Sequence, residues 1–148
     1  MKRLFLLATV VSLLSFGFTQ NTIAQTHSIE EVNQTAMKKE GKYGIMVDNS
    51  QYLMAAIVTG EMYKEYSTDI QYEVVLIGAV VKELADDKNL LPFIERAEKS
   101  GVRIVVCKFA MDKLGVKTSD LPSSVEITGN GFTYYYGLQE LGFRTIAL

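Results

Sequence analysis

The chain contains one cysteine, Cys107, and its neighbours indicate where the thiol lies. An apolar, strand-like run at 102–106 precedes it, and a helix-like run at 108–114, ended by Gly115, follows it. A thiol at such a junction lies against the free backbone N–H groups and the positive dipole end of a helix, which favour the thiolate. Cys107 is therefore the candidate nucleophile. The alternative is that it only continues a buried strand, since free cysteine is among the most often buried residues.

Other residues for catalysis or metal binding are scarce. The only histidine is His27, in a polar segment before the predicted domain. Without spaced histidine and cysteine ligands there is no zinc motif, and no Cys-His or Ser-His-Asp arrangement is available. The dinucleotide fingerprint and the P-loop spacing are also absent. We therefore expect no metal and no cofactor.

The N-terminus has the layout of a secretory signal peptide. Lys2 and Arg3 precede an apolar stretch at 4–14, and a more polar segment ends in a small-x-small pattern at Ala24. We place cleavage after Ala24, so residues 1–24 are the leader, and we expect a periplasmic or secreted protein. The apolar stretch is shorter than a bilayer crossing requires, so we expect no membrane anchor.

The charge balance bears on the partners of the mature chain. Loss of the leader leaves 13 basic and 17 acidic side chains, a net charge near −4, without a basic cluster. Counterion release then gives no drive for binding nucleic acid, and anionic membranes are excluded in the same way. About 124 residues suit one domain with its own core. An unpaired cysteine in an exported protein points to a reactive thiol or a bond between chains.

Strand-like and helix-like periods alternate along the chain. This alternation predicts a three-layer α/β/α domain with a mostly parallel sheet of about five strands. Residues 25–42 form a polar lead-in, and residues 43–148 form the single domain. Asn49 offers an N-cap to the first long helix, and Gly101 offers a left-handed C-terminal residue to a later one. The predicted strands are 43–47, 72–77, 102–106, 125–128 and 144–147, and the predicted helices are 29–39, 51–66, 79–85, one capped by Asn89, 108–114 and 132–141.

The turns that follow parallel strands share one edge of the sheet, because right-handed crossovers place all strand C-termini there. The candidate ligand-binding residues at this edge are Asn49, Gly78, Lys108, Gly129, Asn130 and Gly131. The turn 129–131 precedes a helix, so its N–H groups suit an anion, unless its glycines serve chain geometry alone. It reaches Cys107 only if the third and fourth strands are neighbours. Lys108 either adds positive potential beside the thiol or is a solvated lysine.

Three consecutive tyrosines, Tyr134, Tyr135 and Tyr136, lie on the last predicted helix. Tyr135 and Leu138 are predicted to face the sheet at helical spacing. The other rings are then exposed on a monomer, and tyrosine is enriched at interfaces. We expect a homo-oligomer contact here, with a ligand platform or a partly buried surface as alternatives.

The residues around Cys107 resemble those of a known family. The run 100–107 that ends in Cys107, with the later motif residues, is similar to the central motif of DsrE/DsrF-like proteins, which include the TusD-type sulfur carriers. The tail from 128 to 146 resembles the closing turn, helix and edge strand of that family, and 74–80 resembles its second strand. The resemblance covers most of 43–148. The later motif residues are Met111, Leu114, Gly115, Val116, Asp120, Leu121, Val125, Glu126 and Ile127.

The resemblance implies a sulfur-handling role. In the relay members the matching cysteine accepts sulfane sulfur as a persulfide and passes it to a partner thiol, and the proteins assemble as trimers or hexamers. Only Cys107 takes over this role by position. This chain departs from those cytoplasmic members in its predicted export signal.

Two main functional hypotheses follow. The first is a persulfide carrier on Cys107 that exchanges sulfur with a donor or acceptor protein or a small sulfur compound. The second is a non-catalytic oligomeric module that binds a small anion at the same edge. A third is a redox sensor that dimerises through Cys107.

Overall fold

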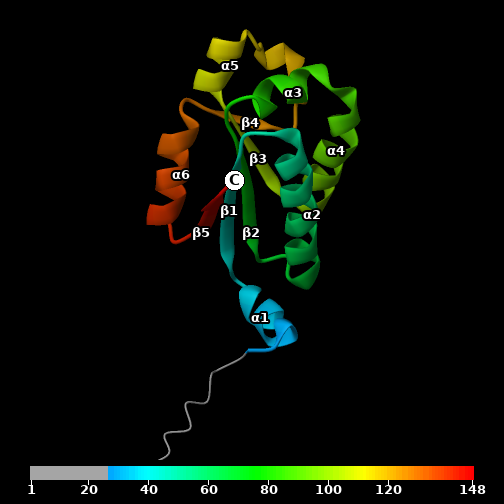
Figure 1. The fold of residues 1–148 in the computed structure, drawn as a ribbon, viewed down its shortest axis with the longest axis vertical. Coiled ribbons are helices and arrows are strands. Elements are labelled where there is room, and N and C mark those ends of the chain that lie inside the picture. The colour runs from blue at the N-terminus through cyan, green and yellow to red at the C-terminus, as the bar shows by residue number, and fades with distance from the viewer. Residues whose placement is uncertain (1–26) are drawn as a thin grey trace, which may run out of the picture.

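A five-stranded sheet lies at the centre of the molecule (Figure 1). The computed structural model describes residues 27–148, so the predicted signal peptide lies outside the described residues. The strand order is β4-β3-β2-β1-β5, and every neighbouring pair is parallel. The strands are β1 (Lys42–Val47), β2 (Gln71–Leu76), β3 (Arg103–Cys107), β4 (Glu126–Thr128) and β5 (Arg144–Ala147). The predicted α/β class is confirmed, with a sheet that is parallel throughout.

Within residues 27–148, six α-helices and two short 3₁₀ turns accompany the sheet. They are α1 (Ile29–Ala36), α2 (Ser50–Tyr66), α3 (Val80–Asp86), η1 (Lys88–Leu90), α4 (Leu91–Ser100), α5 (Lys108–Leu114), η2 (Thr118–Asp120) and α6 (Gly131–Glu140). Figure 1 shows α6 on one side of the sheet and α2 and α4 on the other. The chain crosses the sheet in one direction from β1 to β4 and returns in the opposite direction from β4 to β5. Because each crossover is right-handed, the reversed direction places α6 on the opposite face from the other helices.

Two hydrophobic cores result, one on each face. The larger core packs α2, α3, α4 and α5 against alternate strand residues such as Val74 and Val106. The smaller core lies beneath α6 and consists of Met46, Val75, Tyr135, Leu138 and Phe143. The prediction that Tyr135 and Leu138 face the sheet is therefore confirmed.

Most helix ends follow the sequence signals. The side chain of Asn49 caps α2 by accepting a hydrogen bond from the Tyr52 N–H at 3.0 Å, and Gly101 and Gly115 adopt positive φ at the ends of α4 and α5. The predicted Asn89 cap of α4 is wrong. Asp87 instead accepts a hydrogen bond from the Asn89 N–H at 2.9 Å, because the chain enters α4 through the η1 turn.

Within residues 27–148 we find no helix with the length and apolar character of a membrane-crossing segment.

Candidate functional site

Cys107 lies at the point where the connections of the sheet diverge. It is the last residue of β3 and the residue that precedes α5, and it pairs with Thr128 of the neighbouring strand β4. The third and fourth strands are thus neighbours, as the predicted site requires. The chain leaves β3 through α5 on one face and leaves β4 through α6 on the other. Open parallel sheets bind their ligands at such a switch point, beyond the carboxyl ends of the strands.

The sulfur of Cys107 accepts a hydrogen bond from the backbone N–H of Gly131, with the N and Sγ atoms 3.2 Å apart. Gly131 is the first residue of α6. The sequence predicted donors from α5, and this detail is wrong, because the Cys107 side chain makes no capping hydrogen bond to that helix. Strand alternation explains the difference, since Cys107 lies on the same side of β3 as Arg103 and its sulfur meets Gly131 of α6. The residue also packs at the border of the larger core.

The close approach of α6 to the sulfur depends on a glycine. A Cβ atom at Gly131 would lie 2.7 Å from Cγ2 of Ile77, 3.2 Å from Cβ of Cys107 and 3.5 Å from its sulfur. A Cβ atom at Gly129 would meet nothing within 4 Å. The two glycines of the turn therefore differ: Gly131 permits the contact with Cys107, whereas Gly129 does not need to be glycine for packing.

The N–H groups at the start of α6 have acceptors within the chain. Oδ1 of Asn130 accepts hydrogen bonds from the backbone N–H groups of Phe132 at 2.9 Å and Thr133 at 3.3 Å. The backbone N–H of Gly131 donates to the sulfur of Cys107. The carbonyl of Gly129 accepts from the Phe109 N–H at 3.2 Å. An anion in this turn would have to displace Asn130 or the sulfur. The anion-binding interpretation stays a prediction.

The remaining predicted residues lie along the same edge with other roles. Nζ of Lys108 forms an exposed ion pair with Oδ1 of Asp112 at 2.6 Å. Asn49 serves as the cap of α2, and Gly78 follows β2 with φ near +59°. The structure therefore gathers Gly129, Asn130 and Gly131 around Cys107. It assigns Lys108 and Asn49 to local contacts.

The sulfur is covered, while its aromatic neighbours are exposed. Cys107 has 3% of its surface exposed. Phe109 and Phe132, in the first turns of α5 and α6, are 57% and 52% exposed. Phe109 was not among the residues predicted for the site, although it lies two residues after Cys107.

A polar cluster beneath α6 was also missed. Glu73 of β2 is buried, and it accepts from Nη1 of Arg103 at 3.2 Å and from the Tyr134 hydroxyl at 2.6 Å. Arg103 also contacts both carboxylate oxygens of Glu126 at 2.6 Å. Burial and the hydrogen bond to Glu73 raise the pKa of Tyr134 to about 12. The signal for this cluster was present, because Glu73 is the one acid within the apolar run 72–77 that was predicted as an interior strand.

The sequence model of the DsrE/DsrF-like family matches residues 42–148. The chain belongs to the DsrE/DsrF-like family. The predicted resemblance is thereby confirmed over the sheet and its helices. No curated protein matches the chain.

Solved structures share the fold of this DsrE/DsrF-like chain. A protein of unknown function from Methanobacterium thermoautotrophicum, MTH1491, is 18% identical with a TM-score of 0.66, over 73% of this chain and 99% of its own. The ychN protein from E. coli is 17% identical with a TM-score of 0.59, over 73% and 99%. A conserved protein of unknown function from Bacteroides thetaiotaomicron, BT1422, is 17% identical with a TM-score of 0.53, over 71% and 94%. These similarities show the fold alone.

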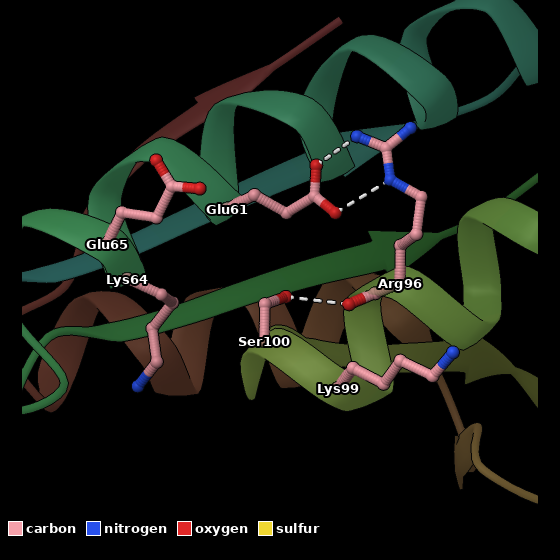
Figure 2. Close-up of a pocket in the computed structure, with 6 residues that line it drawn as sticks. All are labelled: Glu61, Lys64, Glu65, Arg96, Lys99 and Ser100. Carbon is pink, nitrogen blue, oxygen red and sulfur yellow. Dashed lines mark hydrogen bonds and ion pairs between the residues drawn. The ribbon is translucent and has the colours of Figure 1, made fainter.

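A groove of about 450 Å³ on this DsrE/DsrF-like domain lies between α2 and α4 (Figure 2). Glu61 and Arg96 form an ion pair across it, and Nζ of Lys64 bonds to the carbonyls of Thr68 and Ile70 at 2.8 and 2.7 Å. The groove lies near the starts of β2 and β3, whereas Cys107 lies at the end of β3. It is therefore separate from the candidate site. Among residues 27–148 no three His, Cys, Asp or Glu side chains are grouped to hold a metal ion.

Proposed function

We propose that this DsrE/DsrF-like protein carries sulfane sulfur as a persulfide on Cys107 and passes it to a partner thiol. Membership in the family supports a sulfur-relay-type fold. The observation that most supports the role of Cys107 is the hydrogen bond from the Gly131 N–H to its sulfur. A backbone N–H at the start of a helix stabilises negative charge on a thiolate.

The transfer consists of two displacements at sulfur. The Cys107 thiolate attacks the outer sulfur of a polysulfide or of another persulfide. The S–S bond of the donor breaks, the rest of the donor leaves as a thiolate or shorter polysulfide, and Cys107 holds the new persulfide. A partner thiolate then attacks the outer sulfur, so the persulfide moves to the partner and the Cys107 thiolate is restored. The Gly131 N–H stabilises that thiolate both as nucleophile and as leaving group.

Access to the sulfur is part of the proposal. Because Cys107 is 3% exposed, a donor reaches it only when the turn 129–131 moves away from β3. Local opening of this kind needs less free energy than global unfolding. The redox-sensor hypothesis requires the same opening in both copies, because a disulfide forms only between two sulfur atoms that can meet.

Intact mass measurement tests the proposal. The mature chain is treated with polysulfide and weighed, and we expect one added sulfur atom that a reductant removes. Cys107→Ser should show no addition, whereas Gly129→Ala, which changes the turn without touching the sulfur, should behave as the unmodified chain. Equal sulfur addition to the unmodified chain and to Cys107→Ser would exclude Cys107 as the carrier.

We further propose a homo-oligomer that uses the outward side of α6. Phe132 and Tyr136, four residues apart on α6, present exposed apolar surface there, which is typical of an interface. Sedimentation of the mature chain should give more than the monomer mass, and Tyr136→Ser should weaken the assembly. A monomer at all concentrations would contradict this proposal.

The signal peptide predicted at 1–24 leads us to propose export. Fractionation of cells that express the full chain should place it in the periplasm or medium. Its N-terminus should lie near Gln25.

A further inference from the structure

We propose that Tyr134 and Glu73 are positioning residues for Cys107, because their hydrogen bond fixes the first turn of α6 and thereby the N–H that Gly131 donates to the sulfur. The inference rests on the proposed function in one respect, namely that the Cys107 thiolate is the reacting group. The geometry of the positioning contact stands independently of the sulfur donor.

Tyr134 connects the turn to the sheet through two hydrogen bonds. Its backbone N–H donates to the carbonyl of Asn130 at 3.0 Å, which closes the first turn of α6. Its hydroxyl donates to Oε2 of Glu73 at 2.6 Å. One residue is therefore joined both to the turn beside Cys107 and to the central strand β2.

The carboxylate that receives Tyr134 is itself held in place. Glu73 is 7% exposed, and its other oxygen accepts from Nη1 of Arg103 at 3.2 Å. Arg103 is fixed in turn by two hydrogen bonds to Glu126 of β4. The charged and titratable groups around this carboxylate are thus Arg103 and Tyr134, with Glu126 behind Arg103. Because the pKa of Tyr134 is raised to about 12, its hydroxyl remains a donor throughout the neutral range.

No other side chain of the first turn replaces this contact. Gly131 has no side chain, and Phe132 and Thr133 are exposed. The apolar anchors of α6, Tyr135 and Leu138, lie further along the helix. The position of the Gly131 N–H relative to the sulfur therefore depends on Tyr134.

The test compares two tyrosines. Tyr134→Phe removes the hydroxyl that binds Glu73, whereas Tyr66→Phe removes one from an exposed side chain at the end of α2 and serves as the matched control. The thiolate of Cys107 is titrated by its ultraviolet absorbance, with Cys107→Ser as the background. At neutral pH we expect Tyr134→Phe to lower the thiolate fraction by about two- to fivefold. This change is no larger than the loss of one ordinary hydrogen bond to the thiolate would cause. Tyr66→Phe should match the unmodified chain.

A purely structural role predicts a different outcome. Tyr134→Phe would then lower the urea midpoint of unfolding while the titration curve stayed in place, and that result would overturn the inference. A double mutant with Gly131→Ala adds a second test, because coupled positions should give less than the sum of the two shifts. If Tyr134→Phe does not fold, Glu73→Ala takes its place and should shift the titration in the same direction. Glu73→Gln, which keeps an acceptor oxygen for the hydroxyl, should shift it less than Glu73→Ala.

The inference and the proposed function fail separately. If the unmodified chain takes up no sulfur but Tyr134→Phe still shifts the titration, the persulfide role is wrong and the positioning contact stands. If sulfur uptake occurs and the titration does not shift, the positioning role alone is wrong.

Discussion

On one face of the sheet, α2, α3, α4 and α5 bury a cluster of 23 residues, whereas on the other α6 alone buries a cluster of five. The smaller cluster is supplemented by the polar contacts of Glu73, Arg103 and Tyr134. The candidate sulfur site takes its hydrogen-bond donor from this thinly covered face. Most of the buried apolar contacts therefore lie on one face, whereas the donor to the sulfur comes from the other, and Cys107 lies at the border between them as a member of the larger cluster.

This difference bears on how a buried thiol becomes reachable. Regions with few buried apolar contacts open locally at lower free energy than the main core. The first turn of α6, which covers the sulfur of Cys107, belongs to such a region. We therefore expect opening of α6 to expose the sulfur of Cys107 while most of the larger core stays folded.

The largest expected effect comes from truncating one residue on each face. Ile57→Ala, in the larger core, should lower the free energy of unfolding by about 3–5 kcal/mol, and Leu138→Ala, beneath α6, by about 2–3 kcal/mol. Urea unfolding measures both. Alkylation of Cys107 under native conditions should become faster in Leu138→Ala and stay unchanged in Ile57→Ala, because only the first loosens α6. Equal alkylation rates in the two variants would contradict the division between the faces.

A smaller effect is expected at the turn that covers the sulfur. Gly131→Ala should cost about 1–3 kcal/mol of unfolding free energy, since its Cβ would press on Ile77 and Cys107. Gly129→Ala, whose Cβ meets no atom within 4 Å, should stay within about 0.5 kcal/mol of the unmodified chain. Urea unfolding of the pair measures the difference. If the two substitutions cost the same, the close packing of Gly131 against Cys107 does not hold α6 in place.

The sequence was sufficient to predict the elements that have strong local signals. β5 has the bounds that were predicted, and the glycines after α4 and α5 mark their ends as expected. The alternation of strands and helices also predicted the parallel sheet. Local patterns determine these features, so no knowledge of distant contacts was needed.

The contacts of the site could be predicted only in part. The sequence placed the turn 129–131 within reach of Cys107 only on the condition that the third and fourth strands are neighbours, and the sheet order meets that condition. The donor to the sulfur nevertheless comes from α6 and not from α5. Whether a residue of β3 faces α5 or α6 depends on the spatial order of the strands in the sheet, and local residue spacing does not specify that order. The buried Glu73 had a visible signal, whereas its partner Tyr134 lies 61 residues away.

The smallest expected effect concerns the outer end of the polar cluster. A hydrogen bond from Arg103 holds the pKa of Glu126 below its ordinary value of 4.5. Because the folded pKa is the lower one, the ion pair stabilises the fold above pH 4.5 and its contribution disappears as the pH falls through the folded pKa. Glu126 is largely exposed, so we expect less than about 1 kcal/mol.

Glu126→Gln tests this contribution on the α6 face. Urea unfolding at neutral pH should show a small loss of stability relative to the unmodified chain, and the two curves should converge in acid once Glu126 is protonated. Lys82→Gln serves as the control, because Lys82 pairs with Asp86 on α3, on the other face of the sheet. Lys82→Gln should leave the Cys107 titration unchanged. Glu126→Gln should shift that titration slightly, since Arg103 then holds Glu73 less firmly. A constant difference between Glu126→Gln and the unmodified chain at every pH would show that the ion pair does not contribute as described.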